Sequence, residues 1–272
     1  MNNTFNIQRF GLLLKRQWLE FGKIYLITLG VAAGVIIAFY SFSLWRVLIE
    51  KVQQPYVALD FREPLFTIFG FLFITVIASN YFAHLGQKSK AIIDLLIPAS
   101  TFEKFLAGIF FTAVLSSIAY LLIFFVTDLA FVSKLRNMYP NIFWTYTTDA
   151  TEEKKDLITY FFSRYAPKEF TSIYVIVPFF ITSIFLLGSI YFNKYHYIKT
   201  TIAVMIFSGI WGYIIVNTAE LVFKGRVAIY RNSSIEVDNP KLWAEIGIFC
   251  LILLLTAIIW RITYQRLKEK EV

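Results

Sequence analysis

The sequence predicts an all-α integral membrane protein with six transmembrane helices, and three observations lead to this fold class. The 272 residues are 58% hydrophobic and 16% charged, whereas soluble domains average about half apolar and about a quarter charged residues. Six apolar runs approach or exceed the length that crosses a hydrocarbon core of about 30 Å. Lysine and arginine are denser in the segments on one side of these runs, as in cytoplasmic segments.

The chain begins with a predicted interfacial helix over residues 5–23. Its apolar side chains recur at three- and four-residue spacing: Ile7, Phe10, Leu14, Trp18 and Phe21. Basic residues occupy the other faces, and a basic helix with aromatic residues on its apolar stripe lies in the membrane surface. A soluble core helix is the alternative, but no soluble segment follows for it to pack against.

The predicted spans and the interfacial helix form a single membrane domain, residues 1–272. The six spans cover residues 24–45, 65–82, 105–126, 173–192, 200–216 and 242–260. The longest polar segment, residues 127–172, predicts a small external subdomain or lid, which is too short to be an enzyme domain by itself.

Small residues lie at helical spacing on two of the spans. Gly30 and Gly34 form a G-x-x-x-G that Ala38 extends, and the fifth span carries Ser208 and Gly212. Small residues at this spacing let two helices approach closely in a membrane. The first stripe predicts either a dimer seam or a contact with another span of the same chain.

A short polar hairpin, residues 86–104, joins the second and third spans. Lys88, Lys90 and Lys104 place it on the cytoplasmic side. Its middle is apolar around one acid, which predicts a short amphipathic helix over these residues: Ala91, Ile92, Ile93, Asp94, Leu95, Leu96 and Ile97. A short cytoplasmic helix held between two spans can pass force from a soluble partner into a membrane bundle.

The second half of this hairpin predicts a helix stop and a helix start. Pro98 ends the amphipathic helix. Ser100 and Glu103 then have the S-x-x-E spacing of a capping box, which begins the helix that enters the third span.

The charge distribution predicts six spans with both termini inside. The four inner segments hold 13 basic and 5 acidic residues and the outer ones 13 of each, so the whole net charge of +8 lies on the inner face. This distribution of positive charge therefore does not indicate a nucleic-acid-binding patch. The predicted location is the inner, cytoplasmic membrane of a cell.

Catalytic signatures are missing from the sequence. It has no phosphate-binding G-x-x-x-x-G-K-[ST], no H-E-x-x-H and no G-x-S-x-G. We therefore expect no catalytic residues, no cofactor and no metal site. We interpret the two histidines, His84 and His196, as polar anchors at the membrane interface. The alternative is that they form a catalytic or proton-relay pair.

Charged residues deep inside the spans are nearly absent, which disfavours an ion-coupled transporter. Asn217 and Glu220, at the outer end of the fifth span, are candidates to line an exit path. The alternative is that they are ordinary boundary residues that face lipid headgroups.

This arrangement resembles the permease subunit of type-2 ATP-binding-cassette transporters over essentially the whole chain. That family has an elbow helix, six spans, cytoplasmic termini and a coupling helix between the second and third spans. The local motif is Leu96-Ile97-Pro98-Ala99-Ser100 with Lys104 after it. It looks like the family's Leu-Pro-x-Ser pattern and following lysine, with Ile97 inserted. The richness in phenylalanine and tyrosine resembles members from Bacteroidetes.

The resemblance implies a dimer, or a pair with a sister permease, bound to two separate ATP-binding-cassette ATPase subunits. It implies that the ATPase contacts residues 88–97 and that ATP-driven closure moves the second and third spans. In such permeases the first and fifth spans commonly meet at the dimer centre, where the small residues named above would allow the contact. The expected function is export of a hydrophobic or amphipathic substrate in a bilayer of membrane lipid.

Two other hypotheses remain open. The chain could be a membrane scaffold or assembly subunit that uses residues 127–172 to bind a partner. A membrane-embedded enzyme has the least support, because no set of catalytic residues converges in the sequence.

Overall fold

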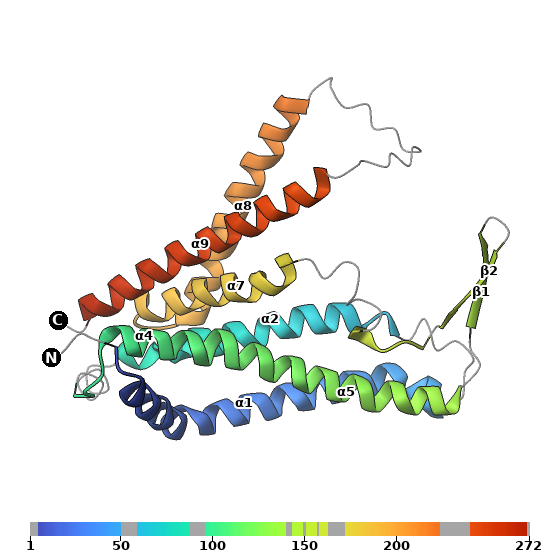
Figure 1. Cartoon of the computed structure of the whole chain (residues 1–272), viewed down its shortest axis with the longest axis horizontal. Helices are drawn as coiled ribbons and strands as arrows, with labels where there is room; N and C mark the ends of the chain where they lie inside the picture. The colour runs from blue at the N-terminus through green and yellow to red at the C-terminus, as the bar shows by residue number, and fades with distance from the viewer. Residues whose placement is uncertain are drawn as a thin grey trace.

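The computed structural model describes residues 5–49, 59–86, 96–139, 143–148, 151–156, 158–162, 172–223 and 240–270. The regular elements of these residues are helices and one two-stranded hairpin. The elements in chain order are α1 (Ile7–Ile49), α2 (Arg62–Tyr81), η2 (Ala83–Gly86), α4 (Thr101–Ile109), η3 (Phe110–Leu115), α5 (Ser116–Met138), β1 (Phe143–Thr148), β2 (Thr151–Asp156), α7 (Ser172–Tyr191), α8 (His196–Phe223) and α9 (Pro240–Lys270). The two chain ends lie at the same end of the bundle (Figure 1), which we call the terminal end, the opposite end being the far end.

The predicted multi-pass membrane protein is confirmed at the level of its apolar helices. In the described part of the chain, five helices are long and apolar enough to cross a membrane, by length and composition. They lie in α1, α2, the α4–α5 segment, α8 and α9. A sixth apolar helix, Val175–Tyr191 within α7, is shorter.

The interfacial helix and the first span, which the sequence separates at residue 23, form one continuous helix. α1 has 43 residues, about 65 Å at 1.5 Å per residue, against a hydrocarbon core of about 30 Å. Figure 1 shows its first turns running in a different direction from the rest. The helix is therefore too long to lie wholly within the core, and its direction changes near the terminal end.

The third predicted span, residues 105–126, is part of a longer helical segment. α4, η3 and α5 run without a break from Thr101 to Met138. Asp128, Val132 and Leu135 are buried in α5, and this continued packing extends the helix beyond the apolar run. The helix therefore continues past residue 126, where the apolar run of the predicted span ends.

Among the described residues, strands occur in the segment that the sequence predicts to be external, residues 127–172. β1 and β2 pair antiparallel, from Phe143 opposite Asp156 to Thr148 opposite Thr151. Figure 1 shows this hairpin projecting from the far end of the bundle. The polar composition of the stretch predicted that it lies outside the membrane, and contained no signal that separated strand from loop.

The core lies where α2 packs between α5 and α7, with α1 against α5 and α9 against α7. Its far end is aromatic: the ring centroid of Phe124 lies 4.9 Å from that of Phe66, 5.0 Å from that of Phe161 and 6.0 Å from that of Tyr40. Such tilted and edge-on pairs add specificity to apolar burial. α8 diverges from the bundle (Figure 1), and its apolar side chains are largely exposed.

Candidate coupling site at the terminal end of the bundle

The helix that enters the third span begins with the capping box that the sequence predicts. Ser100 has the extended backbone of an N-cap residue, and the backbone N–H of Glu103 donates to its Oγ at 3.2 Å. In return, the backbone N–H of Ser100 donates to Oε2 of Glu103 at 2.9 Å. The two bonds satisfy orphan donors at the start of α4, so the prediction is confirmed.

Glu103 also binds the start of α1. Arg9 donates from Nη2 to Oε1 at 2.7 Å and from Nε to Oε2 at 2.8 Å. The backbone N–H of Asn6 donates to Oε1 at 3.0 Å. The Glu103 side chain is completely buried, whereas Arg9 is 31% exposed. We call Asn6, Arg9, Ser100 and Glu103 the Glu103 clamp.

The clamp keeps its carboxylate ionised. Burial alone would raise the pKa of Glu103, but the hydrogen bonds from Arg9 and from the backbone of Asn6 and Ser100 outweigh burial and lower the pKa to about 2. Asn6 meanwhile caps α1, since its Oδ1 accepts from the backbone N–H of Gln8 at 2.9 Å. One carboxylate thus holds together the starts of two helices.

An apolar contact lies beside the clamp. Leu13 of α1, Ile97 and Ala99 of the connecting segment, and Ala107 of α4 form a buried cluster. Residues 97–99 are thereby packed against both helices, so a displacement of this segment would press on α1 and α4 together.

The structure describes half of the predicted coupling residues. Leu96 and Pro98 are exposed, Ser100 and Glu103 form the clamp, and Lys104 is buried. The other predicted coupling residues lie outside the described residues: Lys88, Lys90, Ile93, Asp94 and Leu95.

A second charged network, which the sequence analysis did not predict, lies at the far end. Arg62 Nη1 donates to Asp128 Oδ1 at 3.1 Å, and the hydroxyl of Tyr40 donates to the same oxygen at 2.9 Å. The backbone N–H of Phe161 donates to Asp128 Oδ2 at 2.8 Å, and Arg62 Nη1 also donates to the carbonyl of Thr159 at 2.9 Å. We call these five residues the Asp128 network.

Both charged side chains of the Asp128 network are buried: Arg62 is 1% exposed and Asp128 is 3% exposed. The network joins α1, α2 and α5 to residues 158–162. A signal for it existed in the sequence: Arg62 precedes one apolar run and Asp128 follows the next, so antiparallel spans bring them to the same end. Arg9 offered no such signal, because nothing in the sequence pairs it with a residue 94 positions away.

Between the two sites, the helical segment of the third span contains a π-helical stretch, η3. Thr112 Oγ1 donates to the carbonyl of Gly108 at 2.7 Å, and Ser116 Oγ donates to the carbonyl of Thr112. Phe111 stacks between Trp18 of α1 and Tyr81 of α2. A π-turn is a local change of helical winding that is frequent at functional sites.

The small residues predicted for helix contacts face outward. Gly30, Gly34, Ala38, Ser208 and Gly212 are exposed, and nothing in the described structure lies within 4 Å of a Cβ added at any of the three glycines. The described residues therefore place no other span of this chain against the α1 stripe.

The candidate exit-path residues fall near the far end of α8. The Asn217 side chain donates to the carbonyl of Tyr213 at 2.8 Å, one turn earlier in its own helix. Glu220 belongs to α8, and its side chain lies outside the described part of the structure.

No protein-family model matches this sequence, and no curated protein or solved structure matches it either.

Proposed function

We propose that this chain is the membrane-spanning permease subunit of an ATP-driven exporter and that a separate ATPase subunit drives it. The observation that carries the proposal is the Glu103 clamp. It lies directly after the exposed residues Leu96 and Pro98 and binds the first turn of α1 to the first turn of α4. A push delivered to the preceding segment would therefore reach two long helices at once.

The path of that push follows from packing. The segment around Ile97 and Ala99 rests on α1 and α4, and the bidentate bond between Arg9 and Glu103 keeps their starts together. Farther along, η3 is the local change of winding at which α4 can move relative to α5. Because the Asp128 network holds the helices together at the far end, the push displaces the helices mainly at the terminal end.

The setting we propose is the inner, cytoplasmic membrane, with the terminal end and both chain termini in the cytoplasm. The density of lysine and arginine in the segments of that end supports this orientation. We assign ATP hydrolysis to a separate subunit, in line with the expectation from the sequence, which contains no G-x-x-x-x-G-K-[ST] motif. The exposed stripes of α1 and α8 are the surfaces proposed to meet a second permease, identical or sister.

The proposed substrate is hydrophobic or amphipathic. The support for this is compositional: the spans carry few charges and the chain is 19% aromatic. Asn217 and Glu220 remain the candidates for the exit path.

The test is to purify the tagged chain from its native cells and to identify the proteins that co-purify. We expect an ATPase with ATP-binding-cassette motifs whose ATP hydrolysis rises when the permease is present. Lys90→Glu and Asp94→Lys should each weaken the complex. Glu103→Gln should keep the complex but reduce the stimulation of hydrolysis, since it weakens the bond that ties the start of α1 to the start of α4.

The matched control is Glu269→Gln, which removes an exposed glutamate from its pair with Arg266 at the same end of the bundle. This variant should behave like the natural chain. If no ATPase co-purifies, or if Lys90→Glu and Asp94→Lys leave the complex and its hydrolysis unchanged, the proposal fails.

A second candidate function is a membrane scaffold or assembly subunit. The observation that favours it is the β1–β2 hairpin, which projects from the far end (Figure 1), next to residues 158–162 that the Asp128 network fixes to the bundle. Deleting residues 143–156 would then abolish partner binding, whereas changes in residues 87–97 would be tolerated. The exporter proposal predicts the reverse.

A further inference from the structure

A cavity of about 500 Å³ opens toward the terminal end of the bundle, beside residues 16–24 of α1. Its walls come from four places far apart in the sequence: α1, the end of α2 with η2, Ile97 before α4, and the turn between α7 and α8. Both histidines of the chain, His84 and His196, contribute to the lining. The two histidines, which the sequence analysis interprets as interfacial anchors, therefore line the same cavity.

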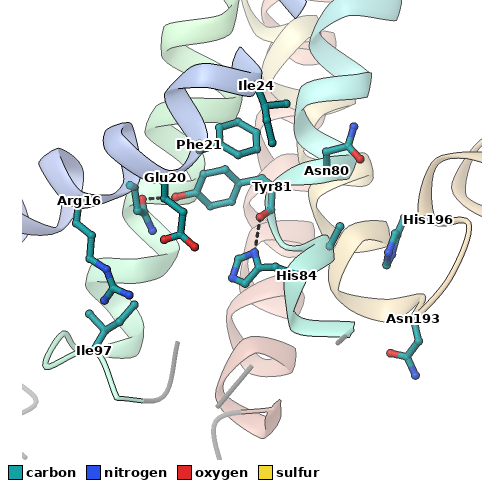
Figure 2. Close-up of a pocket in the computed structure, with 12 residues that line it drawn as sticks. Arg16, Glu20, Phe21, Ile24, Asn80, Tyr81, His84, Ile97, Asn193 and His196 are labelled. Atoms are coloured by element: carbon teal, nitrogen blue, oxygen red, sulfur yellow. Dashed lines mark hydrogen bonds between the residues drawn. The ribbon is translucent and has the colours of Figure 1, made fainter. Parts of the chain in front are cut away.

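The cavity holds opposite charges on one helix face. Arg16 and Glu20 are one turn apart on α1 and both line it. Figure 2 shows the Glu20 carboxylate and the His84 ring pointing into the same space, with Arg16 on one side and His196 on the other. Within the described part of the chain, neither Arg16 nor Glu20 has an ion-pair partner. The site therefore offers a cation and an anion to one ligand.

The surrounding contacts fix the walls of this cavity. The Nδ1–H of His84 donates a hydrogen bond to the carbonyl of Tyr81 at 2.9 Å. The hydroxyl of Tyr81 in turn donates to Oε1 of Gln17, across from α2 to α1. On the opposite wall, Tyr195 has a φ of 56°, a left-handed conformation rare outside glycine, which turns the chain sharply just before His196.

The rim of the cavity is apolar on the side of the membrane core. Phe21 and Ile24 line it, and Ile24 is exposed at the residue where the charge-free run of α1 begins. Polar groups at the mouth of a span with apolar groups immediately beyond them lie at the depth of lipid headgroups. A ligand with a polar head and apolar tails matches both parts of the wall.

We infer that this cavity binds the headgroup of a zwitterionic phospholipid that carries a primary ammonium group, of the ethanolamine type. The phosphate lies against Arg16 and the ammonium against the Glu20 carboxylate. A primary ammonium can donate three hydrogen bonds to such acceptors, whereas the quaternary ammonium of a choline lipid can donate none. The inference is independent of the proposed exporter function, because binding needs no ATPase.

The test is native mass spectrometry of the purified full chain in detergent, equilibrated with equal amounts of ethanolamine, choline and glycerol phospholipids with identical acyl chains. We expect retention of the ethanolamine lipid over the other two by about tenfold, as one charge-assisted hydrogen bond would provide. Glu20→Gln should reduce the ethanolamine lipid to the level of the choline lipid. Arg16→Gln should reduce all three, and Arg266→Gln, an exposed control, should change nothing.

A second measurement needs no variant and separates lipid from free headgroup. The melting temperature of the natural chain should rise more with the ethanolamine lipid than with the choline lipid, and soluble glycerophosphoethanolamine should not reproduce the rise. Equal retention of the three lipids, unchanged preference in Glu20→Gln, or equal stabilisation by the soluble headgroup would each overturn the inference.

Discussion

The two charged networks of this protein use the same chemistry in different surroundings. In each, an arginine from one helix meets a carboxylate from another, and backbone N–H groups complete the acceptor. At the far end both charges are buried, whereas at the terminal end the glutamate is buried and Arg9 is 31% exposed. The comparison shows that a fully buried ion pair holds the helices together at the far end. At the terminal end, the starts of α1 and α4 are held by an ion pair that water can reach.

The largest expected effect is at the anchored end. Asp128→Ala leaves Arg62 buried without its counter-charge and takes an acceptor from Tyr40 and Phe161. Removing one partner of a buried ion pair costs about 3–5 kcal/mol. The melting temperature of the purified protein in detergent should fall by more than for any other variant below.

A double variant distinguishes the missing charge from lost packing. Arg62→Met with Asp128→Leu replaces the pair by apolar side chains of similar volume, and such replacements are often neutral or stabilising. We expect the double variant to recover most of the lost stability. If Asp128→Ala melts like the natural chain, the far end is not anchored by this network.

The next effect is at the terminal end. Glu103→Gln keeps the size of the side chain but replaces its charge-assisted bonds with neutral ones, at a cost of about 1.5–3 kcal/mol. The variant should lie between Asp128→Ala and the control Glu269→Gln in the same melting experiment. A loss as large as that of Asp128→Ala would remove the contrast between the two ends.

Acidification should act on the terminal end through the same carboxylate. The pKa of Glu103 is lowered from 4.5 to about 2 in the folded protein, so its charge stabilises the fold fully above about pH 4.5. That contribution is lost as the pH falls through about 2. The gap in melting temperature between the natural chain and Glu103→Gln should therefore narrow over this interval, and a constant gap would contradict the assignment.

How much of this the sequence could predict differs between the two ends. The S-x-x-E spacing of Ser100 and Glu103 predicted the helix start, because a capping box is local chemistry within four residues. The bond from Arg9 to Glu103 depends on how distant helices pack, and no local pattern encodes it. For the Asp128 network, the positions of Arg62 and Asp128 relative to the apolar runs indicate a shared end of the bundle but not the hydrogen bonds that form there. The continuity of α1 could not be predicted either. The change from amphipathic to apolar sequence at residue 23 marks a boundary in composition, but it does not tell whether the helix continues across that boundary.

A smaller effect is expected from the cap alone. Ser100→Ala removes the acceptor of the Glu103 backbone N–H but leaves the side chain of Glu103 bound to Arg9. Loss of an N-cap costs about 1 kcal/mol, so the melting temperature should fall less than in Glu103→Gln. A larger fall than in Glu103→Gln would mean that the cap, and not the ion pair, holds the terminal end.

The central claim, that the terminal end receives work from an ATPase, is tested most directly by photo-crosslinking in living cells. A photoreactive amino acid replaces Leu96, which is 77% exposed next to the clamp, and the control replaces Ile68, 62% exposed in the middle of α2. We predict an adduct between position 96 and an ATP-binding-cassette ATPase, and none from position 68. An adduct of position 96 with a periplasmic protein, or the absence of any ATPase adduct there, would contradict the claim.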